Sequence, residues 1–219
     1  MKKLFYIIYS LMLLIACIAQ KPEKQEIRFI NEAVARVKNT NKLLILEFTE
    51  PQDRLCIRLR HDVFDNEMNR QFLNDNFELI SVLPSDPVYV SLKNHFKLEY
   101  PGTVLFLDQN GNEIDRTVSY DGNKEGYLSY LKDVSVGKNL YSIVVSAYKR
   151  DSLNVRNNYI FAGKLMYRNQ ISDAIKQYSN VLLYDKDNKF GFNKECQLKI
   201  STSRMLMSGD KNADTYGSE

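Results

Sequence analysis

Tryptophan is absent from this chain, histidine occurs twice, and cysteine occurs three times among 219 residues. His61 and His95 form no metal-site spacing with a carboxylate or a cysteine, and both are expected on exposed helix faces. The nine glycines form no phosphate-binding loop, and neither a Ser-His-Asp order nor a pair of catalytic carboxylates stands out. These absences disfavour metalloenzymes, P-loop proteins and serine hydrolases, and we expect no metal and no cofactor.

The chain also lacks an excess of charge of either sign. Thirty Lys and Arg residues against 27 Asp and Glu residues give a net charge of +3, with no block of like charges. Proteins that bind nucleic acids concentrate positive charge, so nucleic acid is not an expected partner. A hydrophobic content of 44% suffices for a buried core, and the length suits one domain with a smaller appendage.

The one notable hydrophobic run lies at the start of the chain. Lys2 and Lys3 precede the apolar residues 5–15, which are too few to span a bilayer comfortably and are typical of an export signal. Leu14-Ile15-Ala16-Cys17 resembles the lipobox of bacterial lipoproteins. That resemblance implies a signal peptide over residues 1–19, lipid attachment through Cys17, and a location in the periplasm or cell envelope. Cleavage after Ala19, which gives a soluble periplasmic product, is the alternative.

Downstream of a polar tether, residues 20–26, the hydrophobic pattern alternates between helices and strands. Residues 43–48, LLILEF, are apolar on both faces, as a central strand covered by helices requires. An amphipathic helix from Asp53 follows, with an interruption at Asp65 and Asn66, after which Met68 and Leu73 are expected to resume its inward face. Helices are also predicted at 27–37, 89–97 and from 127, and strands at 77–83, 104–108 and 113–119, the last two joined by an Asn-Gly turn.

The order of strand, polar turn and helix resembles the active-site element of the thioredoxin superfamily, which carries a Trp-Cys-x-x-Cys motif. Laid on that motif without a gap, Gln52 takes the Trp position, Asp53 the first Cys and Cys56 the second. The resemblance covers about residues 27–132 and implies an α/β domain over 27–134, with a mixed central sheet flanked by helices. Pro101 matches the cis proline of the family, which implies a groove for a client polypeptide at Gln52, Tyr100 and Pro101.

The resemblance places an acid where the family has its nucleophile. A carboxylate cannot perform thiol exchange, whereas Asp is a favoured N-cap residue, so we expect Asp53 to cap the helix. The family shields the thiol at the Cys56 position and buries an acid at the position of Glu47, whose pKa burial would raise. Cys56 and Glu47 are therefore only candidate catalytic residues, and a disulfide between Cys56 and Cys196 stays open.

Beyond Gly137 the pattern changes to helices without strands. Residues 158–167 and 171–182 resemble one tetratricopeptide repeat, with Ala162, Ala174, Tyr178 and Val181 at its small and aromatic positions. One repeat cannot bury its own face, so we expect flanking helices around 140–147 and 198–205. They would complete a helical region over 138–207, followed by a disordered tail at 208–219.

Three functions are compatible with this sequence. The first is a redox-degenerate thioredoxin-like protein that binds a polypeptide or envelope-protein partner beside Pro101, with a membrane contact if Cys17 is acylated. The second is a thiol-disulfide oxidoreductase that acts through Cys56, alone or with Cys196, so whether the protein is an enzyme stays open. The third is a scaffold in which the helical region binds the partner and the first domain is a spacer.

Overall fold

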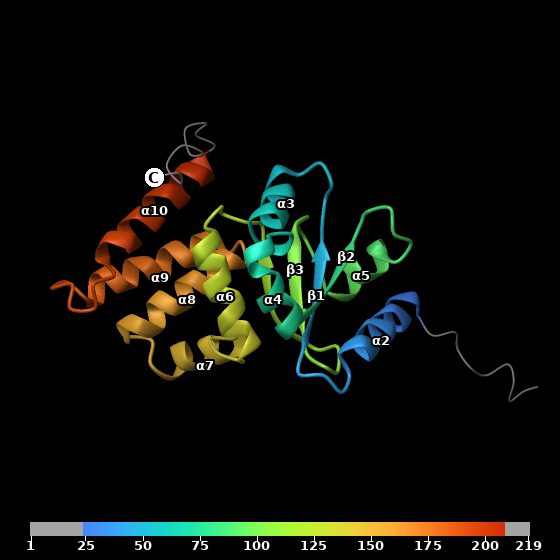
Figure 1. Ribbon diagram of the computed structural model, residues 1–219. Helices are drawn as coiled ribbons and strands as arrows, with labels where there is room; N and C mark the ends of the chain where they lie inside the picture. Colours follow the sequence, from blue (N-terminus) through green and yellow to red (C-terminus); the bar gives the residue numbers. More distant parts are fainter. Residues whose placement is uncertain (1–23, 209–219) are drawn as a thin grey trace, which may run out of the picture.

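The structure, a computed structural model, describes residues 24–208. The predicted signal segment with Cys17, most of the tether and the segment from residue 209 lie outside this range. An α/β part and a helical part pack side by side (Figure 1). Among the described residues, no helix combines the length and apolar character that a membrane span requires.

Four strands form one mixed sheet, in the order β2-β1-β3-β4. β1 is parallel to β2, whereas β3 is antiparallel to both β1 and β4. The strands are β1 (Leu43–Phe48), β2 (Phe77–Val82), β3 (Thr103–Leu107) and β4 (Glu113–Val118), each within one residue of its prediction at either end. A parallel β-α-β half joined to an antiparallel hairpin and a final helix is the thioredoxin-like arrangement, which confirms the expected α/β fold.

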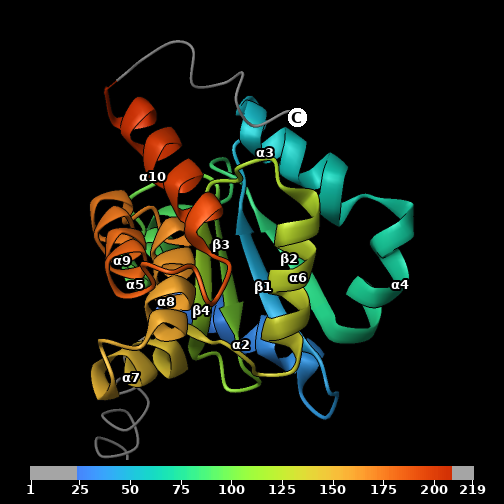
Figure 2. The same ribbon diagram turned by 90° about the vertical axis from the view of Figure 1, so that its left-hand side faces the viewer.

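Alternate residues of the central strand β1 enter different cores. Leu44, Leu46 and Phe48 face one core, whereas Ile45 and Glu47 face the other side of the sheet. The first face is covered by α2 (Gln25–Val37) and α5 (Tyr89–His95). The second is covered by α3 (Arg54–Leu59), the π-helical turn η1 (Arg60–Phe64), α4 (Glu67–Asn76) and α6 (Lys124–Ser135). Figure 2 shows α6 in front of the sheet and α2 and α5 behind it.

The helix that follows β1 breaks where the sequence predicted an interruption. η1 ends in a bend at Asp65, and the Asn66 side chain accepts a hydrogen bond from the Met68 amide to start α4. Met68 is 87% exposed, so its predicted inward position is wrong, because the bend restarts the helix with a different face toward the sheet. Leu73 is buried as expected.

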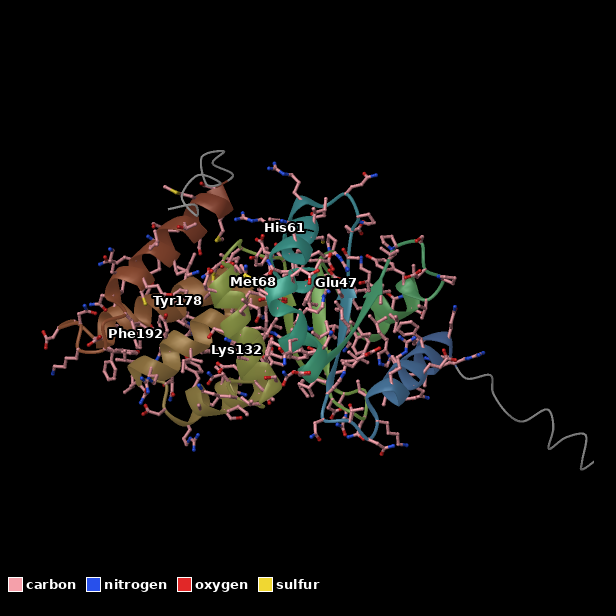
Figure 3. The ribbon with its side chains drawn as sticks, viewed as in Figure 1. Glu47, His61, Met68, Lys132, Tyr178 and Phe192 are labelled. Atoms are coloured by element: carbon pink, nitrogen blue, oxygen red, sulfur yellow. The ribbon has the colours of Figure 1, made fainter. Side chains whose placement is uncertain are left out.

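The helical part contains α7 (Tyr141–Arg150), α8 (Val155–Tyr167), α9 (Ile171–Tyr184) and α10 (Asn193–Ser208), each packed on the next. The predicted helical hairpin is present as α8 and α9, and all four of its small and aromatic core residues are buried. Tyr178 and Phe192 are labelled in this part in Figure 3. That the α8–α9 hairpin is a tetratricopeptide repeat stays a prediction. The flanking helices are present as α7 and α10, in which Ile143 and Leu198 are about half exposed.

A buried ion pair joins the two parts of the molecule. Asp115 on β4 accepts a hydrogen bond from the Lys164 ammonium of α8 at 2.5 Å, and their side chains are 0% and 6% exposed. Arg168 lies 3.5 Å from the other oxygen of Asp115. The Lys164 ammonium also lies 4.1 Å from the centre of the Tyr130 ring on α6. Burial lowers the pKa of Lys164, while the carboxylate of Asp115 opposes that shift. The helical part is thereby fixed against the edge strand β4.

Removing one partner of this pair is expected to destabilise the protein strongly. In Lys164→Met, the carboxylate of Asp115 would stay buried with Arg168 as its one remaining ion-pair partner among the described residues, which should cost about 3 kcal/mol of unfolding free energy. Urea denaturation measures this cost. Lys189→Met is the matched control, because its ion pair with Asp187 is more than three-quarters exposed, and we expect a change within about 0.5 kcal/mol. Equal effects of the two substitutions would contradict this role of the buried pair.

Candidate functional site

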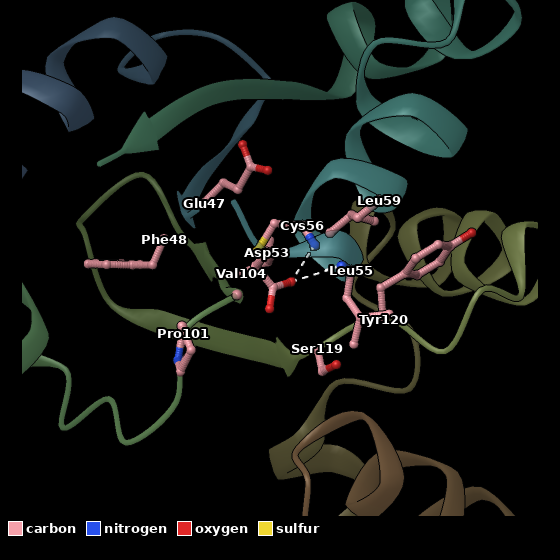
Figure 4. Close-up of a pocket in the computed structure, with 11 residues that line it drawn as sticks. Glu47, Phe48, Asp53, Leu55, Cys56, Leu59, Pro101, Val104, Ser119 and Tyr120 are labelled. Carbon is pink, nitrogen blue, oxygen red and sulfur yellow. Dashed lines mark hydrogen bonds between the residues drawn. The ribbon is translucent and has the colours of Figure 1, made fainter. Parts of the chain in front are cut away.

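Asp53 begins the helix that faces the end of β1. Its Oδ1 accepts hydrogen bonds from the backbone amides of Leu55 and Cys56, both at 2.9 Å. This is the predicted N-cap, and it satisfies two of the four amide groups that every helix start leaves unpaired. Figure 4 shows the carboxylate turned back onto the helix start. The residue at the nucleophile position therefore has a structural task.

Cys56 lies one turn into the helix and is shielded. It is 5% exposed, and a Cβ atom at Gly102 would lie only 3.2 Å from its Sγ. Burial raises the pKa of the Cys56 thiol, and the nearby Asp53 carboxylate adds to that shift. A reactive thiol needs the opposite environment, exposed and electropositive. Cys56 is thus a shielded thiol that favours its protonated form.

Glu47 is fully buried on β1 beneath this helix, with 2% of its surface exposed (Figure 3). Its Oε2 accepts hydrogen bonds from Arg60 of η1 at 2.5 Å and from Ser81 of β2 at 2.9 Å. Burial raises the pKa of Glu47, against the opposing effects of Arg60 and Ser81. This confirms the predicted direction. Arg60 and Ser81 were missed at the sequence level, because nothing in their spacing shows that they meet an acid on β1.

Arg60 continues the network away from Glu47. Its guanidinium forms a two-pronged interaction with Asp65, at 3.2 and 3.1 Å. Glu47 Oε1, by contrast, is buried without a hydrogen-bond partner among residues 24–208. A proton relay needs an acid beside a dithiol, and here the acid is held by a cation beside a single thiol. Glu47 is therefore anchored through Oε2 by Arg60 and Ser81, beside one thiol instead of two.

The loop that carries Pro101 differs from the family pattern. No peptide bond among residues 24–208 is cis, so the expectation of a cis Pro101 is wrong. The chain instead turns at Gly102, whose φ is +68° and whose amide donates to the Phe48 carbonyl at 3.0 Å. The Tyr100 carbonyl accepts a hydrogen bond from the Thr103 hydroxyl at 2.9 Å, so one of its two lone pairs is engaged within the turn. Pairing of a client backbone at Tyr100 stays a prediction.

These elements enclose a small cavity of about 40 Å³. Its lining includes Glu47, Cys56 and Pro101, and Leu55 and Ser119 lie at an exposed part of the lining (Figure 4). The volume is far below the roughly 300–1,000 Å³ of typical small-molecule pockets. The site thus has room for a small polar group and not for an organic cofactor. Among the described residues, no group of His, Cys, Asp or Glu could hold a metal ion.

The remaining predicted site residues are distributed around this cavity or away from it. Gln52 and Tyr100 are exposed beside it, as a contact surface requires. His61 and His95 are exposed, as predicted. Cys196 is buried in the core of the helical part and is unpaired, as is Cys56, so the possible disulfide between them is absent. Burial raises the pKa of Cys196 to about 11, with a further contribution from Glu195.

Thiol labelling checks this description of the cysteines. Iodoacetamide is expected to leave Cys56 and Cys196 of the folded protein unmodified at pH 7–8, because both thiols are buried with raised pKa values. Both should react in urea, with mass spectrometry resolving the two sites. Ser119→Cys places an exposed thiol at the same cavity and should react in the folded state. Rapid labelling of Cys56 without denaturant would show that its thiol is accessible in the folded protein and would contradict this description.

Comparison with known proteins adds little to this geometry. No protein-family model matches the chain, and no curated protein matches it. Among solved structures, the chain is similar to one described as "DsbH Oxidoreductase", with 17% sequence identity and a TM-score of 0.41. The similarity covers 49% of this chain and 81% of that chain. The thioredoxin-like fold rests on the strand order and connections described above, and no activity follows from this similarity.

Proposed function

We propose that this chain is an exported protein that binds a polypeptide partner in the bacterial envelope without thiol-disulfide exchange. The observation that carries the proposal is the side chain of Asp53, which caps the helix at the position where exchange needs a thiolate. The N-terminal signal pattern and the lipobox-like Cys17 support export and lipid attachment. Both features lie before residue 24, outside the described residues.

The contact surface proposed here is the Pro101 face, made of Gln52, Leu55, Tyr100, Pro101 and Ser119. Leu55 and Tyr100 are 42% and 46% exposed, although both are large and apolar or amphipathic. They stand on a capped helix start and a hydrogen-bonded turn, so they are presented on a rigid frame. Exposed apolar side chains held in this way favour a protein contact, and the small cavity beneath them suits a side-chain tip.

No observation favours the oxidoreductase alternative. Exchange through Cys56 alone needs an accessible thiolate, and exchange with Cys196 needs the two sulfurs within bonding reach. Cys56 lies in the α/β part beneath Gly102, whereas Cys196 is fully buried within the helical part. The scaffold alternative treats the α/β part as a spacer. The buried Asp115–Lys164 pair argues against separable parts, so truncation at Leu140 is a poor test, and point substitutions are required.

Photo-cross-linking tests the Pro101 face. A benzoylphenylalanine in place of Tyr100 is expected to capture a discrete partner in cells that export the chain. The same group in place of Ile143 on α7 should capture none. Ile143 is 50% exposed, which is close to the exposure of Tyr100, but it lies outside the Pro101 face. Capture at Ile143 and not at Tyr100 would favour the scaffold function and contradict our proposal.

A cysteine variant separates binding from redox chemistry. Among residues 24–208, Cys56 is the one thiol near the Pro101 face, and Cys56→Ser removes it. We expect the yield of the Tyr100 cross-link to stay within about twofold of the parent chain, because burial makes Cys56 a small packing residue. Quantitative immunoblotting of the adduct measures the yield. Circular dichroism of the variant confirms that it is folded. Loss of the adduct in the folded variant would favour the oxidoreductase function instead.

A further inference from the structure

A second cleft lies away from the Pro101 face, near the start of β1 and β2. Its volume is about 400 Å³, ten times that of the cavity beside Cys56, and within the range of binding pockets. The cleft is bordered by α4 and the edge strand β2, and Figure 2 shows α4 on the outer side of β2. Its apolar lining residues are Ile45, Phe64, Leu73, Phe77 and Leu79. We refer to it as the α4 cleft.

The cleft exists because the helix over the sheet breaks at an anchored bend. η1 is a π-helical turn, a feature that is frequent at functional sites, and Asp65 at its end is held by the Arg60 guanidinium. The Asn69 side chain donates to the Val63 carbonyl at 3.0 Å, which fixes the start of α4 to the end of η1. The direction of α4 is therefore set by charge and hydrogen bonding, and α4 buries only Asn69 and Leu73.

The wall of the cleft formed by β2 has free hydrogen-bonding groups. β2 is an outer strand, and the Thr49 amide donates to the Val82 carbonyl, so Val82 and its alternate neighbours face β1. In an extended strand, the amide and carbonyl groups of Leu79 and Ser81 then point outward. Within residues 24–208, no strand pairs with β2 on that side. An outward row of this kind is a template for an added strand.

The charges around the cleft favour one sign of ligand. Two acids line it, and each already has a cation: Asp65 has Arg60, and Glu78 lies 3.6 Å from Arg36. Two cations also line the cleft: Arg70 is paired with Glu67, whereas Lys42 has no carboxylate within ion-pair distance among the described residues. A negative group would thus find the unpaired Lys42, whereas a positive group would compete with cations already in place.

We propose that the α4 cleft binds an extended polypeptide segment bearing a carboxylate, which adds as a strand to β2 through Leu79 and Ser81 and places the carboxylate near Lys42. The backbone hydrogen bonds would supply the pairing, and the apolar lining would receive alternate side chains. This site is separate from the Pro101 face, so the proposal does not depend on the proposed function.

The experiment titrates three synthetic peptides into the isotopically labelled chain lacking residues 1–19. The probes are Thr-Val-Thr-Val-Thr-Glu with a free carboxyl end, its amidated Gln counterpart, and a form N-methylated at alternate residues. We expect the first probe to shift the backbone amide signals of Leu79 and Ser81. N-methylation should weaken binding about tenfold or more, because it removes the paired amides. Amidation should weaken binding by about two- to fivefold.

Variants of the chain complete the test. Lys42→Gln should weaken binding of the carboxylate probe by about two- to fivefold and leave the amidated probe unchanged. Lys38→Gln, an exposed lysine that does not line the cleft, is the matched control and should change neither. Absence of shifts at Leu79 and Ser81 with all probes overturns the proposal. Shifts at Leu55 and Tyr100 alone also overturn it while supporting the Pro101 face. Concentration-dependent dimerisation through β2 without probe would identify a second copy as the occupant and overturn it too.

Discussion

The buried charge of Glu47 on the central strand is the constraint on which the α/β part depends. A carboxylate with 2% exposure needs a cation and hydrogen-bond donors, and here Arg60 and Ser81 supply them. Arg60 can serve two acids only from a position above the sheet, so it also fixes Asp65, where the helix bends. The π-helical turn ends at Asp65, α4 begins two residues later, and Asp65 also lines the cleft beside β2. The buried acid is thus connected through Arg60 to the residue at which the helix bends and the cleft begins.

At the opposite edge of the sheet, the buried pair of Asp115 and Lys164 holds α8 against β4. Asp115 on β4 is covered by α8 and paired with Lys164, and Arg168 lies between Asp115, Glu113 and the ring of Tyr141. A sheet edge covered by helices is protected from unwanted pairing. β2 also lacks a strand on its outer side among residues 24–208, but there the neighbouring helix, α4, borders β2 across the α4 cleft. The two edges of the same sheet therefore differ, and the cleft is what makes β2 the edge proposed for a partner.

The sequence predicted the elements well because strands and helices have different hydrophobic periods. Residues 43–48 were placed correctly from their apolar run, and Asp53 was recognised as a cap because a carboxylate before an amphipathic stretch satisfies helix amides. Met68 was misplaced because a periodic pattern does not show the change of phase across a bend. Pro101 was assigned from family resemblance, whereas the turn depends on Gly102. The contacts of Arg60 and Ser81 with Glu47 join residues 13 and 34 positions apart, and the contact of Lys164 with Asp115 joins residues 49 positions apart. Local sequence patterns do not reveal contacts over such separations.

The contact between β4 and α8 has a further consequence for how this chain reaches its native state. Lys164 follows its partner by 49 residues, and its ammonium is stable in that position only when β4 and α6 already provide a carboxylate and an aromatic ring. Separating the two parts would break this pair and also remove Tyr167 from the rings of Tyr127 and Tyr130. The two parts should therefore unfold together as one cooperative unit. For a chain with a sheet and a helical bundle side by side, domain boundaries drawn from secondary structure do not mark boundaries of stability.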